Sequence, residues 1–409
     1  MGSKPTIDSL HLFIIPTWYP SQSAPLSGNS IKEQTELFAR YYPDATIGIS
    51  MWGQREESHL LWTKDHIKNL KKIIRFFFYK KRQREVLPNL IEYYTPALTW
   101  TKKFFSGNSR GMIRANEKNF LRFQKKVGRV DLIHAHVSYP GGYVAMHLSK
   151  KYKIPYIITE RMGPFPFPDF LNKDGSLKKI ILDPLKKANQ VVAISYALSE
   201  RIKSFGITNV EVIPNFIDEN FFVPPSPGKP KRNAFSFFFL GLLSKEKGLY
   251  DLLDAIVLLP KQITSVEFWI AGYGDPTPFQ QYAKEWGIEN KLKWLGKLTR
   301  EEVRNTMQQC DIFILPSHHE SFGTVYIEAL ACGKPIIAAN NGGVLDIICG
   351  LNGFLIAEDI ETSAQQILYI INNPQEYNSN DIRKDFEENF SASAVIPRWI
   401  KLYQQVIHG

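Results

Sequence analysis

Short apolar runs alternate with amphipathic segments along most of this chain. Apolar runs of four to eight residues between turn residues predict buried strands, and apolar residues at helical spacing predict the helices between them. In the first half we expect strands at 11–15, 45–50, 131–134, 156–159, 191–194 and 210–213, with helices at 31–41 and 142–152. In the second half we expect strands at 235–240, 266–271, 291–295, 311–315, 335–338 and 353–356. This alternation predicts an α/β protein with doubly wound parallel sheets.

The two series are separated by residues 223–233, VPPSPGKPKRN, whose proline and charge predict a linker. We therefore expect one domain over residues 1–222 and a second over residues 234–391, which the 409-residue length allows. Residues 392–408 have the pattern of a long amphipathic helix. Two α/β domains joined by one linker predict a cleft between the facing carboxyl ends of their strands.

The composition, 44% hydrophobic and 22% charged residues, is that of a globular protein. The three cysteines, Cys310, Cys332 and Cys349, have no C-x-x-C spacing, so neither a disulfide framework nor a zinc site is indicated. The start of the chain lacks a signal-peptide pattern, and no segment approaches the ~20 apolar residues of a membrane span. We expect a cytoplasmic protein, in a reducing compartment.

The excess positive charge, 50 Lys and Arg against 40 Asp and Glu, is concentrated in residues 71–84, KKIIRFFFYKKRQR. Such a basic, aromatic segment suits an anionic membrane surface, which would make the protein peripheral on the inner face of the cytoplasmic membrane. A solvated helix with its aromatic side against the core explains the pattern equally well. No nucleic-acid fold signature accompanies the charge, so we expect no nucleic-acid partner.

The most informative stretch is 316–343, PSHHESFGTVYIEALACGKPIIAANNGG. The apolar run 311–315 predicts a buried strand, and a helix is expected from Thr324 to the helix-ending Gly333. The loop between them follows the carboxyl end of a strand, where α/β sheets bind ligands. Backbone N–H groups around Gly323 and Thr324 would be unpaired at the helix start and would suit a phosphate.

Glu320 and Glu328 stand in the setting H-E-S-F-G-x-x-x-x-E-A-x-A-x-G-x-P-x-I. This string resembles the signature of the retaining glycosyltransferases of family 4, which have the GT-B fold of two Rossmann-like domains facing across a cleft. The resemblance implies a nucleotide-sugar donor, UDP- or GDP-linked, and no separate cofactor. It places Glu320 by the donor sugar, the backbone of Phe322 to Thr324 against sugar and diphosphate, and Glu328 on the ribose hydroxyls. It also implies that the last helix, 392–409, crosses back to the first domain.

A second candidate loop, GLLSKEKG, follows the strand at 235–240. The turn at Gly241 and the cation of Lys247 could point donors at a phosphate. The family pattern is G-R-L-x-x-x-K-G, so Leu242 stands where relatives carry an Arg that neutralises the diphosphate; another cation could replace it. Gly272, after the strand at 266–271, resembles the family's turn beside the nucleotide, with an ordinary β-turn as the alternative.

In the first domain, Gly28 lies in a loop where relatives carry a glycine near the diphosphate, although such a loop often only turns the chain. His134 and His136 alternate on a strand, so we expect them to face opposite ways and not to share a metal. His134 is interpreted as a satisfied buried histidine, and His136 as a contact to acceptor or donor. Arg161 stands where many relatives have a donor-contacting His, and an Arg cannot act as a base but can bind an anion or hydroxyl.

The family resemblance implies a retaining transfer in which the leaving diphosphate takes the acceptor proton. No Asp-x-Asp pair exists, so we expect no metal. Trp18, Tyr19 and Pro20 could form an acceptor wall or only pack, and the acceptor is expected to be a saccharide or polyprenyl-linked saccharide of bacterial surface polysaccharide synthesis. A non-catalytic nucleotide-sugar-binding or scaffolding protein is the alternative, motivated by Leu242 and Arg161. An epimerase has no motif support, and a dinucleotide oxidoreductase lacks G-x-G-x-x-G.

Overall fold

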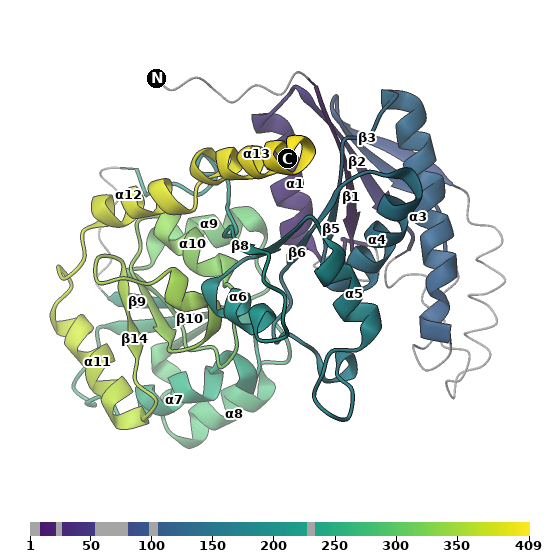
Figure 1. The fold of residues 1–409 in the computed structure, drawn as a ribbon. Coiled ribbons are helices and arrows are strands. Elements are labelled where there is room, and N and C mark those ends of the chain that lie inside the picture. The colour runs from purple at the N-terminus through teal and green to yellow at the C-terminus, as the bar shows by residue number, and fades with distance from the viewer. Residues whose placement is uncertain (1–8, 22–26, 54–80, 98–104, 227–233) are drawn as a thin grey trace. The chain divides into compact units, whose positions relative to one another are not determined.

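The computed structural model describes residues 9–21, 27–53, 81–97, 105–226 and 234–409. The chain forms two compact units. The first comprises residues up to Ile194, then Leu198–Ile213 and Ile396–Gly409, and the second comprises Ser195–Ala197 and Pro214–Val395. Figure 1 shows both as layered α/β structures, and each is described by itself.

The first unit is built on an eight-stranded sheet of order β3-β4-β2-β1-β5-β6-β7-β8. Only β3 is antiparallel, to its neighbour β4, in the described sheet. The strands are β1 (Leu10–Pro16), β2 (Ala45–Met51), β3 (Arg82–Leu87), β4 (Leu90–Tyr94), β5 (Leu132–His136), β6 (Tyr156–Glu160), β7 (Gln190–Ala193) and β8 (Val210–Val212). The helices are α1 (Asn29–Tyr41), α3 (Phe105–Val127), α4 (Tyr143–Tyr152), α5 (Lys179–Lys187) and α6 (Tyr196–Lys203). Two short helical turns, η1 (Ser138–Gly142) and η2 (Pro168–Phe170), follow β5 and β6.

Helices cover both faces of this sheet (Figure 1). On one face the ring of Phe13 in β1 packs against Phe120 and Phe123 of α3, with ring centroids 5.4 and 5.7 Å apart. On the other face His134 of β5 contacts Tyr403 of the C-terminal helix α13 (Ala392–His408). The alternation of side chains along buried strands explains why these runs are apolar at nearly every position.

The second unit is built on a six-stranded sheet of order β11-β10-β9-β12-β13-β14, parallel at every pairing. The strands are β9 (Phe235–Leu242), β10 (Val266–Tyr273), β11 (Leu292–Gly296), β12 (Ile312–Leu315), β13 (Ile336–Ala339) and β14 (Gly353–Ile356). The helices are α7 (Leu249–Val257), α8 (Thr277–Glu285), α9 (Arg300–Gln309), α10 (Thr324–Ala331), α11 (Ile360–Asn372) and α12 (Ser379–Asn389). The short helices η3 (Lys245–Lys247), η4 (Glu289–Lys291) and η5 (Gly342–Asp346) complete it.

The predicted α/β architecture is confirmed, and every predicted strand is present with its ends displaced by at most two residues. Two strands, β3 and β4, were missed. The sequence of β3, RQREVL, has no apolar alternation because this strand lies at the sheet edge with its first four residues exposed. Residues 82–84 of the basic segment are therefore strand rather than helix, and residues 71–80 lie outside the described structure. No helix within the described residues is long and apolar enough to cross a membrane.

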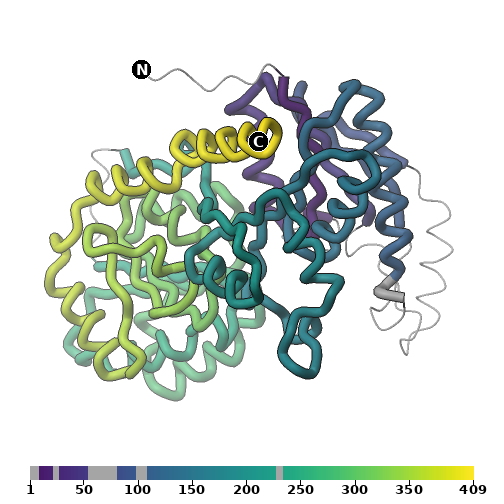
Figure 2. The backbone as a smooth tube through the Cα atoms, in the orientation of Figure 1, coloured from purple at the N-terminus to yellow at the C-terminus, as the bar shows by residue number. Residues whose placement is uncertain are grey.

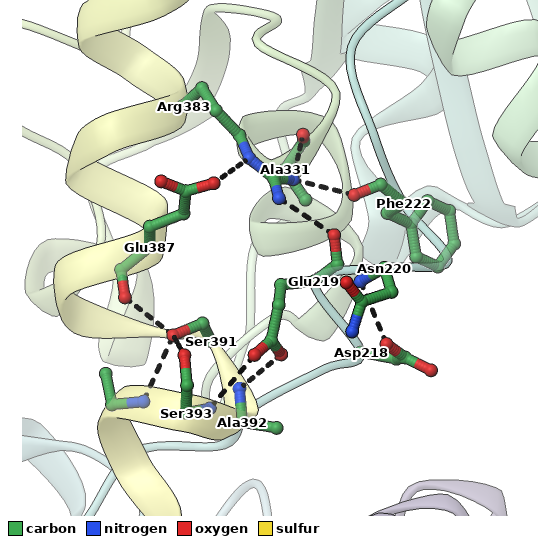
Figure 3. A network of polar contacts seen from close by, with 11 residues as sticks. Asp218, Glu219, Asn220, Phe222, Ala331, Arg383, Glu387, Ser391, Ala392 and Ser393 are labelled. Atoms are coloured by element: carbon green, nitrogen blue, oxygen red, sulfur yellow. Dashed lines mark hydrogen bonds and ion pairs between the residues drawn. The ribbon is translucent and has the colours of Figure 1, made fainter.

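The chain passes between the units near residues 217–219 and 391–393, and these two segments are bonded to each other inside the second unit (Figure 3). Ile217 and Ser391 form a parallel β-bridge. The carboxylate of Glu219 accepts the backbone N–H groups of Ala392 and Ser393, at 3.0 and 3.3 Å, and so caps the start of α13. Both segments are thus bonded together within the second unit, which begins at Pro214 apart from Ser195–Ala197. The linker expected at 223–233 stays a prediction.

Arg383 of α12 completes this network (Figure 3). Its guanidinium donates to the carbonyl oxygens of Phe222, Ala331 and Glu219 at 2.7, 2.7 and 2.8 Å. It also pairs with Glu387 at 2.7 Å. Figure 2 follows the chain through α12 into α13, the last two helices of the yellow stretch. The helix α13 thus begins in the second unit and continues into the first from Ile396 onward.

Candidate functional site

The loop after β12 is held in place by glycines. Gly323 has a left-handed conformation, with φ 88°, and caps α10. A Cβ at this position would lie 2.4 Å from the ring of Tyr326, whose hydroxyl is fixed by a 2.7 Å bond to the carbonyl of Leu315. No side chain caps the first turn of α10. Glycine therefore allows the loop to bring Thr324 and the free N–H groups of this helix start to the carboxyl end of the sheet.

Glu320 and Lys247 form an ion pair. Glu320 comes from the loop after β12, and Lys247 from η3 after the neighbouring strand β9. Their side chains are 13% and 27% exposed, so the pair is shielded but accessible. The structure thus brings together two charged residues that the sequence predicted from separate motifs. Phe322 differs, because its ring is buried and contacts Phe390, which leaves only its backbone available to a ligand.

Close backbone packing surrounds this ion pair. Gly241 and Gly272 are register partners in β9 and β10, and a Cβ on Gly272 would lie 1.6 Å from the carbonyl oxygen of Gly241. A Cβ on Gly248 would lie 1.9 Å from the carbonyl oxygen of Pro316. The strand ends therefore present backbone rather than side chains, as a phosphate-binding surface requires.

A further support was missed by sequence reasoning. Gly343 donates its N–H to the carbonyl of Glu320 at 3.0 Å. A Cβ on Gly342 would lie 2.0 Å from that same carbonyl oxygen, and Asn341 donates to the carbonyl of Ser317. The signal was the sequence NNGG after β13, which permits such a close approach.

Glu328 is buried in α10 and pairs with Arg300 at the start of α9. The Arg300 guanidinium also lies 4.7 Å from the centre of the Phe222 ring. Sequence reasoning missed Arg300 because it is 28 residues away on a different helix. A carboxylate has lone pairs beyond those used by one Arg, so this pairing is compatible with the ribose-binding role that the resemblance implies.

The slot of the missing Arg is open. Leu242 is 54% exposed at the end of β9, and its register partner in β10 is Tyr273. The ammonium of Lys297, just after β11, lies 4.9 Å from the centre of the Tyr273 ring. Lys297 is therefore a second cation close to this strand end. We call Gly241, Lys247, Glu320, Gly323 and Glu328, with their loops, the donor-loop site.

In the first unit, Gly28 has φ 73° and begins α1. A Cβ at this position would lie 2.3 Å from the carbonyl oxygen of Trp18, so the loops after β1 can meet only with a glycine here. This close approach is sufficient to explain the glycine, and its contact with a diphosphate stays a prediction.

His134 and His136 lie on the same face of β5, with ring centroids 4.3 Å apart. The expectation that they face opposite ways was wrong, because residues two apart on a strand point to the same side. His134 is hydrogen bonded to Tyr403 at 2.9 Å and to Thr159 at 2.7 Å, which confirms its interpretation as a satisfied buried histidine. His136 is also buried, and its Nδ1 has no hydrogen-bond partner.

Burial governs the protonation of both rings. It lowers the pKa of His134 to about 3, with a further contribution from the charge of Arg161. The pKa of His136 is lowered well below its ordinary value by burial and then by the neighbouring His134 and Arg161. Both imidazoles are therefore neutral at physiological pH. His136 is thus a neutral hydrogen-bonding group there rather than a cation.

Arg161, after β6, is a half-buried cation whose guanidinium is incompletely bonded. Its Nη2 donates to Gln34 at 2.7 Å, while its buried Nε and Nη1 have no hydrogen-bond partner. Burial lowers the pKa of its guanidinium to about 10, so it stays charged at neutral pH. The carboxylate of Glu160 is occupied by the N–H groups of Ser138, Arg161 and Met162. We call His134, His136, Glu160 and Arg161 the Arg161 centre; its unpaired donors suit an anion or sugar hydroxyls.

Comparison with known sequences agrees with this architecture. A family model described as Glycosyl transferases group 1 matches residues 220–390, and one described as Glycosyltransferase Family 4 matches residues 80–221. The two matches meet at 220–221 and together run from residue 80 to residue 390. This chain belongs to the group 1 glycosyltransferases of family 4, and its two parallel-sheet units have the GT-B fold. It is a glycosyltransferase that uses a nucleotide sugar.

Individual relatives are distant. An uncharacterized glycosyltransferase of Methanocaldococcus jannaschii is 27% identical over 294 residues, 68% of this chain and 76% of the relative. A Bacillus subtilis protein, TuaC, named for teichuronic acid biosynthesis, is 29% identical over 223 residues, 52% of this chain and 54% of the relative. Anabaena HepE, solved in complex with UDP, has a TM-score of 0.68 at 19% identity and covers 97% of this chain and 100% of its own.

Proposed function

We propose that this protein is a retaining glycosyltransferase that moves a sugar from a UDP- or GDP-linked donor to a saccharide or lipid-linked saccharide acceptor. The observation that carries the proposal is the ion pair of Lys247 and Glu320 beside the uncapped start of α10. A cation and helix-terminal N–H groups suit a diphosphate, and a carboxylate suits sugar hydroxyls. The UDP complex of HepE supports a uridine donor.

The chemistry proposed for this site needs few protein atoms. The bond between the anomeric carbon and the diphosphate oxygen breaks, and the acceptor oxygen forms its bond on the same face of the sugar. The acceptor proton passes to the leaving diphosphate oxygen. Lys247 and the first turn of α10 would stabilise the negative charge that develops on the diphosphate. Glu320 would orient the donor sugar, and Glu328 would fix the ribose.

Metal independence is part of this proposal. Within the described residues, no group of three or more His, Cys, Asp or Glu side chains is placed to hold a metal ion. The diphosphate charge would instead be met by Lys247, and by Lys297 in place of the cation that Leu242 cannot supply; the position of the Lys297 ammonium over the Tyr273 ring supports this. Transfer that persists at full rate in excess chelator would support this assignment, whereas a requirement for Mg²⁺ or Mn²⁺ would overturn it.

Bacterial surface polysaccharide synthesis is the proposed pathway, at the cytoplasmic face of the membrane. The likeness to TuaC supports it. Binding to vesicles that contain anionic lipid, measured by co-sedimentation at low salt, tests the membrane association. The basic residues 71–81 are the segment to replace with Gln and Ser as the comparison, and equal sedimentation of both proteins would remove this segment's role.

A non-catalytic nucleotide-sugar-binding protein is the second candidate, favoured by the exposed Leu242 in the Arg slot. A thermal-shift screen against UDP-, GDP- and ADP-linked sugars identifies the donor, because a ligand that binds the native state raises the melting temperature. The sugar released from that donor, or transferred, is then followed by ¹H NMR of its anomeric proton. Turnover with retained configuration supports the enzyme; binding without any turnover over days favours the second candidate.

A further inference from the structure

The first unit contains a cavity of about 330 Å³ that lies apart from the Arg161 centre. It is formed where three parallel strands end, with Tyr19 and Pro20 after β1, Met51 at the end of β2 and Tyr94 at the end of β4. The carboxyl ends of strands are where α/β units bind ligands, and this volume is within the range of small-molecule sites. The cavity is a candidate acceptor site, an interpretation that rests on the proposed function.

The edge strand β3 supplies charge to one side of this cavity. Arg82 and Arg84 are the register partners of Tyr94 and Glu92 in β4, and all four line the cavity. Lys32 of α1 also lines it. Lys32 is paired with Glu36 at 3.9 Å, so the two arginines, set against Glu92, carry the excess of positive charge that would attract an anion.

The arginine side chains are held in defined positions. The buried Glu92 accepts the Tyr19 hydroxyl at 2.8 Å and Nε of Arg84 at 2.9 Å. The bond to Arg84 uses Nε only, which leaves its two terminal nitrogens to reach a ligand. The Arg82 guanidinium lies 5.2 Å from the centre of the Tyr94 ring. The Arg84 side chain is 64% exposed, so its terminal nitrogens are accessible to a ligand, while the buried carboxylate of Glu92 fixes the direction of its guanidinium, an arrangement that suits anion recognition.

Other parts of the lining suit a sugar ring. Tyr19, Pro20, Met51 and Tyr94 provide aromatic and apolar surface next to the cations. A phosphate alone would need donors but no such surface, whereas a sugar that carries an acidic group uses both. Burial raises the pKa of the Tyr19 hydroxyl, so this group stays protonated and bonded to Glu92.

We propose that this cavity binds an acidic sugar of the acceptor, with Arg84 and Arg82 on its carboxylate or phosphate and Tyr19 and Tyr94 against its ring. The site determines which acceptors the enzyme accepts. Uronic acids and sugar phosphates share this chemistry, and the experiment separates them.

The test is direct binding to the full chain without donor, measured by ligand-observed NMR and calorimetry. The probes are glucuronic acid, glucose 6-phosphate, neutral glucose and inorganic phosphate. We expect one of the two charged sugars to bind at least tenfold more tightly than glucose and inorganic phosphate. Arg84→Gln and Arg82→Gln should each weaken that binding at least tenfold. Arg129→Gln is the matched control. This substitution removes the same charge, and Arg129 is 82% exposed and does not line the cavity.

Several outcomes would overturn the proposal. Equal affinity for glucose and its charged derivatives would show that the cavity does not recognise the acidic group. Equal affinity for inorganic phosphate and the charged sugars would show that it binds a free anion and not a sugar. Unchanged binding in both arginine variants would place the sugar elsewhere. Nucleotide-sugar binding to the same variants, measured by thermal shift, separates this test from that of the proposed function. Failure of the donor to bind even the wild type would count against the function and leave the cavity result intact.

Discussion

The donor-loop site and the Arg161 centre differ in how completely their charged groups are paired. In the donor-loop site each predicted carboxylate already has a cation, Glu320 with Lys247 and Glu328 with Arg300. In the Arg161 centre the cation is half-buried, and two of its buried nitrogens have no hydrogen-bond partner. A ligand at the first site must compete for charges that are already paired. A ligand at the second would satisfy donors that the fold leaves without partners.

This difference separates binding from stability. Partly exposed ion pairs contribute little to folding, typically about 0–1 kcal/mol, so Lys247 can be changed at small structural cost. A half-buried, incompletely bonded cation lowers the stability of the fold and indicates that something other than stability maintains it. Arg383 in the second unit is the internal reference, since it is also half-buried but each of its three nitrogens has a hydrogen-bond partner.

The largest expected effect is on catalysis at the donor-loop site. Lys247→Ala should lower the rate of sugar transfer or donor hydrolysis by about 10²- to 10³-fold, as for loss of one group that stabilises developing charge. The melting temperature should change little, because Lys247 is 27% exposed. Lys245→Ala is the control, being exposed on the same short helix. Equal losses in the two variants, or a loss that follows unfolding, would contradict the assignment.

The next effect is on stability at the reference residue. Arg383→Ala should lower the free energy of unfolding by on the order of 3 kcal/mol, because it leaves three backbone carbonyls without their charged donor. Urea denaturation followed by fluorescence measures it. Lys384→Ala is the neighbouring control, with a side chain that is 74% exposed and a single 4.0 Å ion pair. A loss under about 0.5 kcal/mol in Arg383→Ala would show that the network is not stabilising.

Arg161→Met tests the second side of the comparison. Removing a half-buried cation with two unpaired nitrogens should leave stability unchanged or raise it by about 1 kcal/mol, while transfer falls by about tenfold or more. Denaturation and steady-state rates are measured on the same preparation. A strongly destabilised but fully active variant would mean that Arg161 serves the fold alone.

The last effect is a dependence of stability on pH, which is small within one pH unit. Because burial lowers the pKa of His134 to about 3, the unfolded chain binds a proton that the folded chain does not. The contribution of His134 to the free energy of unfolding is therefore complete above pH 6.5. It is lost as the pH falls toward 3, by at most about 1.4 kcal/mol per pH unit. Histidine ring NMR should show His134 and His136 neutral down to pH 5. A midpoint near 6.5 for either ring would refute the role of burial.

The sequence predicted the donor-loop site better than the Arg161 centre for a physical reason. Glu320, Gly323 and Glu328 lie in one continuous loop and helix, so their spacing alone describes the local geometry. Lys247 was predicted in the same way, from the loop that follows the neighbouring strand β9. Arg300 was missed because its contact with Glu328 depends on how two helices pack. Tertiary packing of this kind leaves no local pattern.

The first unit was harder to predict. Tyr403, which bonds His134, is 269 residues away from it along the chain. The strands β3 and β4 were missed because an exposed edge strand needs no apolar alternation and Glu92 interrupts the apolar run of its neighbour. The cavity that these strands line was missed with them, although Tyr19 and Pro20 were considered as an acceptor wall.

One measurement tests the central claim most directly: ¹H NMR of the anomeric proton during turnover of the nucleotide sugar that raises the melting temperature. The account predicts that the wild type releases or transfers the sugar with the donor's own anomeric configuration. It also predicts that Lys247→Ala is equally folded and turns over the donor about 10²- to 10³-fold more slowly. An inverted product, or the same rate in Lys247→Ala as in the wild type, would contradict it.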